Sequence, residues 1–263
     1  MKKHRLAEMT WVEAREIFAE NPVILIPNGS IEQHGPVTPM GDYRYVDDIS
    51  SKIAEQTGAV LCPVVPWGYS EHFKHFPGTI TLRSETLNML LEDHIDSLIR
   101  FGLDHIMLVC GHKGNMPILE HLCRKIKEKH SIRIATVQPL TWFNDEMRRK
   151  IYGVDKPKTG HGSDPMQSLG MYLYPDDIRL DLLEAGNEPV WRGQRFKGTD
   201  TTFTDGYMWH LYLDYDELAK NGVIGDPNLA GTDIGQKIVE HLVKVGCKIV
   251  SKFRDLDTKI SKD

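Results

Sequence analysis

Residues 27–48, PNGSIEQHGPVTPMGDYRYVDD, decide the fold and place the first functional residues. The apolar run VILI stands directly before them, and a short, continuously apolar run is typical of a strand buried on both faces. Glu32 and His34, two side chains that bind divalent metals, follow this strand, and Asp42 lies farther along the same loop. A surface loop does not need so many metal-binding groups. The stretch therefore predicts part of a metal-centred active site at the end of a buried strand.

The same order of apolar run, loop and helix recurs along the chain. Apolar runs at residues 59–65, 105–110 and 132–137 predict three more strands, and apolar residues at helical spacing predict the helices between them. Strands that alternate with helices indicate an α/β fold with three αβα layers and a mostly parallel central sheet. No linker or shift in composition divides the chain, so we expect residues 1–263 to form a single domain.

Capping residues mark where several helices should begin. Thr10 and Glu13 have the spacing of a capping box, which predicts a first helix that ends near residue 20. Ser84 and Thr232 stand at the start of other amphipathic stretches and are expected to cap their helices. Residues 186–214 are rich in Gly, Thr, Trp and Tyr and should be irregular or form short strands.

The overall composition excludes several classes of protein. Hydrophobic residues make up 40% and charged residues 26%, which is ordinary for a globular enzyme. The net charge of -5 and the lack of a basic block indicate no nucleic-acid partner. No apolar run is long enough to span a bilayer and the N-terminus lacks the core of a signal peptide, so we expect a cytoplasmic protein with no membrane partner. The four scattered cysteines form no CxxC pair and should be buried structural thiols, with disulfides or a zinc site as the alternatives.

Glu32, His34, His72 and His112 share one position, just after a predicted strand. Ligands of parallel α/β sheets bind beyond the carboxyl ends of the strands, so these residues are expected to share a site. His112 stands between two glycines in the segment GHKGN, where backbone can approach a ligand closely. The alternative is an exposed histidine in a loop that starts a helix.

Two further segments carry candidate residues. In HGSD, His161 could move protons and Asp164 could supply one more metal carboxylate, although Asp164 could also merely cap the helix before Pro165. In the long loop after the second strand, Trp67, Tyr69 and His72 suit a lid that faces the substrate. The alternative is that these aromatic side chains only pack the loop.

Together, four segments resemble motifs of the creatininase (creatinine amidohydrolase) family. They are GSIEQHGP, HFPGTITL, GHKGN and HGSDPMQS, and they follow one another in the order found in that family over roughly residues 23–175. The resemblance implies a three-layer α/β fold and a site with two metal ions. It also implies hydrolysis of a C–N bond, often in a cyclic amide, by a homo-oligomer that is commonly a hexamer.

The resemblance also implies roles for individual residues. Glu32 and His112 would hold one metal, His34 would hold the other, and Asp42 would bridge both. His161 matches the acid/base histidine of the family.

This chain departs from the family pattern at three places. Asp42 fits the bridging position only if one residue is deleted before it. Creatininase has a glutamate where this chain has Gly114, so Asp164 is expected to supply the missing carboxylate. Lys113 replaces a glycine and could stabilise a developing oxyanion, and the neighbouring Asn115 is expected to contact the substrate.

The predicted function is therefore that of a metal-dependent hydrolase. Two divalent ions (Zn, Mn or Fe) would activate a water between them, and this water would cleave a C–N bond in a small cyclic or related amide. One alternative is a hydrolase that opens an oxidised inositol (a 3-dehydro-scyllo-inosose-type diketo-inositol) at a C–C bond, because the polar loop and Lys113 suit a sugar-like ring. A second alternative is a relative that binds a small molecule without catalysis.

Overall fold

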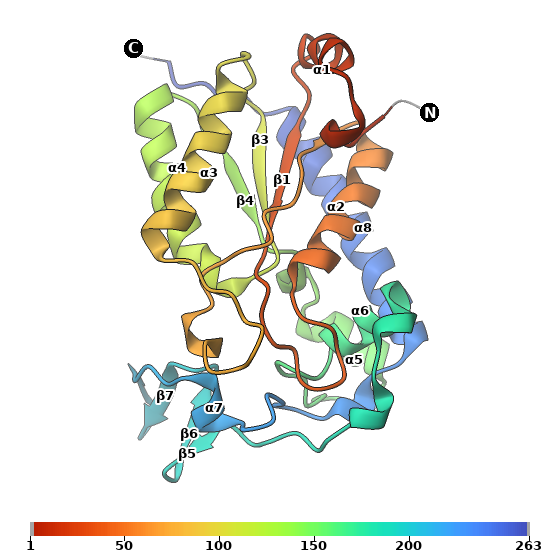
Figure 1. The fold of residues 1–263 in the computed structure, drawn as a ribbon, viewed down its shortest axis with the longest axis vertical. Helices are drawn as coiled ribbons and strands as arrows, with labels where there is room; N and C mark the ends of the chain where they lie inside the picture. Colours follow the sequence, from red (N-terminus) through yellow and green to blue (C-terminus); the bar gives the residue numbers. More distant parts are fainter. Residues whose placement is uncertain (1–2, 262–263) are drawn as a thin grey trace.

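The centre of the molecule is a four-stranded parallel sheet, seen in the computed structural model, which describes residues 3–261 (Figure 1). The strand order is β2-β1-β3-β4, so β1 pairs with β2 on one side and with β3 on the other. The strands are β1 (Ile24–Asn28), β2 (Val60–Leu61), β3 (Ile106–Cys110) and β4 (Ala135–Val137). The prediction of a mostly parallel sheet is confirmed.

Helices cover both faces of this sheet and give the three layers. One face is covered by α1 (Trp11–Phe18), α3 (Ser84–Ile99) and α4 (Met116–His130), and the other by α2 (Tyr43–Thr57), α6 (Met166–Leu173) and α8 (Thr232–Arg254). The strand β1 contributes to both cores: Ile24 and Ile26 pack on the side of α3 and α4, and Leu25 packs on the side of α2 and α8. A strand buried on both faces favours apolar side chains throughout, which explains the apolar sequence of β1 up to its last residue, Asn28.

The ends of these elements agree with the sequence only in part. Thr10 and Glu13 form the predicted capping box at the start of α1. The expectation that Ser84 and Thr232 cap helices is wrong, since both are the first helical residues and the extended residues before them offer no capping side chain. The strand β2 is shorter than predicted, because Pro63 follows it closely and has no N–H for the ladder.

A second, antiparallel sheet lies below the carboxyl ends of the central strands (Figure 1). Its strand order is β5-β6-β7-β8. Residues 186–214 were expected to be irregular or to form short strands, and the short strands are confirmed. The short helix α7 (Tyr215–Leu218) contacts both β5 and the helix η2 (Glu71–Phe73) of the loop after β2. The strands are β5 (Val190–Trp191), β6 (Gln194–Lys197), β7 (Thr201–Thr204) and β8 (Tyr207–His210).

Two further expectations concern thiols and membranes. All four cysteines are free thiols, as predicted, but only Cys62 and Cys110 are buried, while Cys123 and Cys247 are partly exposed. Within residues 3–261, none of the helices combines the length and the apolar character needed to cross a membrane.

Candidate metal centre

Five of the predicted site residues, Glu32, His34, Asp42, His112 and His161, lie in two groups near the carboxyl ends of β1 and β3. The backbone N–H of Gly111, after β3, donates to the carbonyl oxygen of Asn28 at the end of β1, 2.7 Å away. The loop after β2 folds over the same edge, where the backbone N–H of Tyr69 donates to the side-chain oxygen of Asn115 at 2.9 Å. Three loops that are far apart in the sequence therefore surround one place.

Glu32, Asp42 and His112 form a first group of side chains that could hold a metal. Nδ1 of His112 lies 3.0 Å from Oε2 of Glu32 and 3.1 Å from Oδ2 of Asp42, and all three residues are buried. Asp42 directly precedes α2, and its Oδ1 accepts a hydrogen bond from the backbone N–H of Ser30 at 2.7 Å. A Cβ at Gly29 would lie 2.5 Å from this oxygen, so a glycine there leaves room for the carboxylate.

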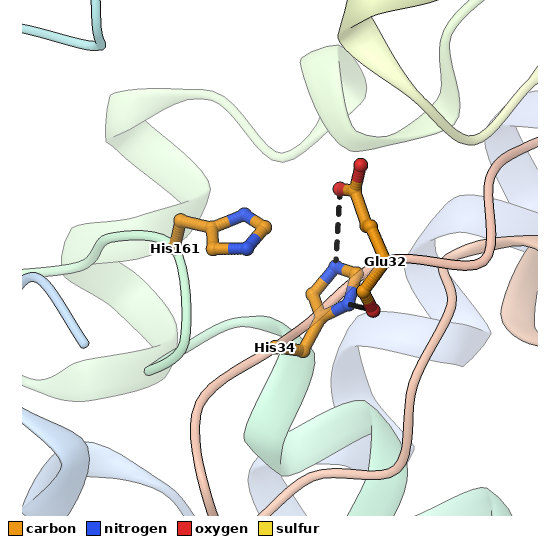
Figure 2. Close-up of side chains that lie close together, drawn as sticks. All are labelled: Glu32, His34 and His161. Carbon is orange, nitrogen blue, oxygen red and sulfur yellow. Dashed lines mark hydrogen bonds and ion pairs between the residues drawn. The ribbon is translucent and has the colours of Figure 1, made fainter. Parts of the chain in front are cut away.

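Glu32, His34 and His161 form a second group (Figure 2). Nε2 of His34 lies 3.8 Å from Oε1 of Glu32, and the rings of His34 and His161 are stacked with their centroids 4.6 Å apart. Glu32 thus belongs to both groups and turns one oxygen toward His34 and the other toward His112.

In His34 and in His112, one ring nitrogen donates to a backbone carbonyl, which leaves the other nitrogen facing the carboxylates where a metal could bind. Nδ1 of His34 donates to the backbone carbonyl of Glu32 at 3.2 Å, so Nε2 is the nitrogen that faces the carboxylate. Nε2 of His112 donates to the backbone carbonyl of Tyr69 at 2.9 Å, so Nδ1 faces the two carboxylates. Metal-binding histidines are commonly oriented by such bonds, and this mixture of oxygen and nitrogen suits zinc, manganese or iron.

The charges of the first group depend on one another. Burial raises the pKa of Asp42, and the neighbouring Glu32 carboxylate raises it further. Burial is the largest single influence and opposes the charge of Glu32, but the attraction and hydrogen bond of His112, together with His34 and His161, outweigh it and lower the pKa of this carboxyl. Burial also opposes the imidazolium of His112, yet the two carboxyl groups raise the pKa of His112 well above its usual value. A proton on His112 therefore occupies the position between the carboxylates that a cation would take.

His161 is held as a neutral ring beside the second group. Burial, followed by repulsion from His34, lowers the pKa of His161 to about 3. Nε2 of His161 donates to the backbone carbonyl of Gln33 at 2.6 Å, and the ring of Phe73 stacks on the imidazole with centroids 4.3 Å apart. The hydroxyl of Tyr215 donates to the carbonyl of His161 at 3.2 Å. The ring is therefore fixed and uncharged.

A third group of possible metal ligands is more exposed than the first two. It consists of His75, Asp214 and Asp216. Nζ of Lys74 lies 3.5 Å from Asp214, so a cation is already present there.

A sequence model of the creatininase family, described as creatinine amidohydrolase, matches residues 7–250. The chain belongs to the creatininase family. It is a metal-dependent hydrolase of the creatinine amidohydrolase type.

Three relatives in the family have different activities. The chain is 26% identical to the mycofactocin precursor peptide peptidase of Mycolicibacterium smegmatis, over 89% of the chain and 86% of the relative. It is 30% identical to the creatinine amidohydrolase of Pseudomonas putida, over 67% of the chain and 74% of that enzyme. It is 28% identical to the 3-dehydro-scyllo-inosose hydrolase of Thermotoga maritima, over 93% of the chain and 83% of that enzyme.

Solved creatininase structures share the fold. A mutant creatininase complexed with creatine superimposes with a TM-score of 0.79 at 24% identity, over 96% of this chain and 99% of that chain. Other solved creatininases include a zinc–zinc form and a manganese form. The predicted α/β fold of the creatininase type is thereby confirmed.

The structure does not bring Asp164 to the metal-binding groups of this creatininase-family enzyme, contrary to the expectation from sequence. Oδ1 of Asp164 accepts from the backbone N–H of Ser168 at 2.8 Å. Oδ2 accepts from the hydroxyls of Ser168 at 2.6 Å and Tyr152 at 2.8 Å. The carboxyl group thus holds the first turn of α6 to α5 (Asp145–Tyr152), which is the alternative that the sequence left open.

Asn115 also has a structural position rather than the expected contact with a substrate. It is fully buried, and its amide donates to Asn28 at 3.3 Å and to the carbonyl of Gly29 at 3.1 Å. Its oxygen accepts from the backbone of Tyr69. These bonds hold the loops after β1, β2 and β3 together.

Of the remaining predicted residues, His72 and Tyr69 lie near His112. The ring of His72 stacks at 6.1 Å from that of His112. Tyr69 contributes its backbone carbonyl to His112, while its ring packs against the core beneath α3. Trp67 is 45% exposed, and Lys113 is exposed in the short helix η3 (Lys113–Asn115).

Gly114 has no space for the glutamate that creatininase carries at this position. A Cβ at Gly114 would lie 2.3 Å from Nε2 of His112 and 2.5 Å from the carbonyl of Tyr69. The glycine therefore permits the bond that orients His112.

Ser70 is a site residue that the sequence did not reveal. Its buried hydroxyl lies 2.5 Å from Oε2 of Glu32, 2.5 Å from the hydroxyl of Ser30 and 3.1 Å from Nε2 of His112. A hydroxyl has one hydrogen, so Ser70 donates to Glu32 and accepts from Ser30. A single serine in a long loop has no spacing pattern that would mark it.

Proposed function

We propose that this enzyme uses two divalent metal ions to hydrolyse the C–N bond of an amide. The observation that supports the proposal is the position of Glu32, a buried carboxylate that belongs to two groups of metal-binding side chains and turns one oxygen toward each. A single ion would need only one of these groups.

The ligands divide between the two ions according to the two groups. Glu32, Asp42 and His112 would hold one ion, and Glu32 and His34 would hold the other. The bridging role of Asp42 stays a prediction, because Asp42 belongs to the first group only. When bound, zinc, manganese or iron would polarise the amide carbonyl and lower the pKa of the attacking water.

His161 is proposed to carry the proton from the attacking water to the leaving nitrogen. Its Nε2–H is committed to the carbonyl of Gln33, so Nδ1 is the atom that accepts the proton. Because burial lowers the pKa of His161 to about 3, the imidazolium formed is a strong acid and passes the proton on to the departing amine. Phe73 and His34 hold the ring between them throughout.

An amide is proposed as the substrate because two of the three relatives act on amides by name. One is a creatinine amidohydrolase and the other a peptide peptidase. The partly exposed Trp67 and the ring of His72 remain the proposed contacts for a small molecule.

The opening of a keto-inositol is the second candidate. It is supported by the 28% identity to the 3-dehydro-scyllo-inosose hydrolase, which extends over 93% of the chain. In that reaction the same residues would act on a ketone, and the bond broken would be C–C.

We also propose a homo-oligomer. The resemblance to the family implies one, and the strand β8 supports it, because Tyr207 is 79% and Met208 is 62% exposed at the edge of the second sheet. Light scattering at several concentrations tests the mass of the particle.

One experiment tests the function and separates the candidates. The purified enzyme is stripped with a chelator, loaded with zinc or manganese, analysed for metal content and offered cyclic amides, short peptides and keto-inositols. We expect two ions per chain and metal-dependent release of an amine from an amide. Release of no amine, together with turnover of a keto-inositol, would replace the amide proposal by the second candidate. One ion per chain at full activity would contradict the dinuclear centre.

A further inference from the structure

A groove lies between helix α4 and the edge strand β4, outside the metal centre. Its volume is about 720 Å³, which is the size of a specific binding site. Helix α4, at the left of the molecule in Figure 1, contacts β4, the edge strand of the central sheet. The groove is lined by Lys113, Met116, Pro117, Glu120, Cys123, Arg124, Lys127, Arg133, Ile134, Thr136 and Gln138.

The floor of the groove is the open edge of the sheet. The strand β4 is the last in the order β2-β1-β3-β4, so among residues 3–261 it has a sheet partner on one side only. Ile134, Thr136 and Gln138 alternate along the chain and therefore point to the same face of the sheet, the face that α4 covers. An edge strand with unpaired backbone groups can accept one more extended chain.

The walls of the groove carry uncompensated positive charge. Four cationic side chains line it against one carboxylate, Glu120, and this carboxylate is paired with Arg124 at 2.8 Å. Lys113 and Lys127 have no ion pair among the described residues, and Arg133 donates to a backbone carbonyl rather than to a carboxylate. This accumulation stands out in a chain whose net charge is -5.

The other side of the same helix is neutralised. Lys125 pairs with Glu92 at 2.6 Å, and Lys129 pairs with Asp96 at 2.5 Å, both across to α3. The lysines of α4 are therefore balanced where they face the protein's own helix, and unbalanced where they face the groove.

We propose that this groove binds an acidic segment of polypeptide in extended conformation, laid along the free edge of β4. The free strand edge recognises a backbone, and the cations above it recognise acidic side chains. From Met116 to Lys127 the wall of α4 extends for roughly 17 Å at 1.5 Å per residue, which matches about five residues of extended chain. Lys113, next to the metal ligand His112, forms one end of the groove, so the bound segment approaches the metal centre.

A labelled ten-residue peptide of alternating glutamate and valine is the probe, and its binding to the full chain is followed by fluorescence anisotropy. We expect saturable binding at low salt that weakens as salt is raised, because the charges are exposed. The double variant Lys127→Gln with Arg133→Gln should lose about tenfold in affinity. The control, Lys125→Gln, removes one positive charge from the other side of α4 and should change the affinity less than about twofold. Circular dichroism establishes that the variants are folded.

Two further probes decide which chemistry is recognised. The same peptide with every second backbone nitrogen methylated should bind at least about tenfold more weakly, since it can no longer pair with β4. A single-stranded oligonucleotide of equal charge should not displace the peptide. Equal binding of the methylated peptide, displacement by the oligonucleotide, an equal loss in Lys125→Gln, or no binding at low salt would each overturn the proposal.

Discussion

Nδ1 of His112 lies 3.0 Å from Oε2 of Glu32, and both side chains are buried. The other oxygen of Glu32 faces His34. Burying a carboxylate is costly unless a cation compensates it, and here an imidazolium does so until a metal can. The site is therefore prepared for cations before any is bound.

The central position of Glu32 leads to the first prediction. Glu32→Gln keeps the size of the side chain but removes the charge that both groups share. We expect metal content to fall below two ions per chain and kcat to fall at least about 100-fold, more than the loss usual for residues that only support a ligand. Metal analysis and steady-state kinetics measure this. Glu71→Gln, at an exposed position next to Ser70 in the loop after β2, is the control and should behave as the wild type.

The role proposed for His161 gives a different pattern. His161→Asn should reduce kcat by about 100-fold or more, the range typical of a lost acid/base group, while both ions remain bound. If the variant loses an ion, His161 is a ligand of the second group and not a proton carrier. Metal content and kcat must therefore be measured on the same preparation.

The raised pKa of His112 predicts that metal binding depends on pH. A metal can bind Nδ1 only after the proton has left, and Glu32 and Asp42 raise the pKa of His112 well above its usual value. Protons compete with metal at every pH below that raised pKa, so metal affinity should increase as pH rises and binding should release protons. Calorimetry in buffers with different heats of ionisation counts the protons. An affinity that is constant between pH 6 and about 8 would contradict the coupling.

The folding stability of the metal-free protein should change with pH in the opposite direction to its metal affinity. Because the folded pKa of His112 lies above the unfolded value, this group stabilises the folded metal-free chain fully at pH values below the unfolded pKa. That contribution is lost as pH rises through the folded pKa. A metal-free sample should therefore lose part of its stability over the same pH range in which metal binding becomes tighter.

Much of the fold and part of the site could be predicted from sequence because the signals are local. The strand β1 is continuously apolar, and Glu32 and His34 stand within a few residues of its end, so sheet geometry places them. The strand β2 is only two residues long, because the prolines that follow interrupt an apolar run that looked longer. The apolar pattern alone does not contain this information.

Other parts of the site depend on contacts between distant segments. Ser70 reaches Glu32 across 38 positions of the chain, and nothing near either residue indicates the contact. The local sequence around Asp164 fits a metal ligand and a helix-capping carboxylate equally well. Only the position of Tyr152, which folds back to donate to Asp164, separates the two.

Ser70 is predicted to support the first group through Glu32. Ser70→Ala removes the hydroxyl that donates to Oε2 of Glu32 at 2.5 Å and leaves that oxygen with one donor fewer. Losing such a supporting bond typically weakens metal binding by about 10- to 100-fold. Competition with a chelator measures the affinity. Ser97→Ala, on the exposed side of α3, is the control and should leave it unchanged.

The position of Asp164 leads to a prediction about stability rather than catalysis. Asp164→Ala removes a buried carboxyl group and leaves the hydroxyl of Tyr152 and the N–H of Ser168 without their acceptor. Unsatisfied buried groups cost about 1–3 kcal/mol each, so thermal unfolding should shift clearly downward. The folded fraction should still bind two ions and keep its kcat, because Asp164 is absent from both groups of metal-binding residues. Tyr152→Phe removes only one of the bonds and should destabilise the chain less. If Asp164→Ala instead keeps its stability and loses an ion, Asp164 is a metal ligand after all, and the carboxyl group must turn from α6 toward His34 when the metal binds.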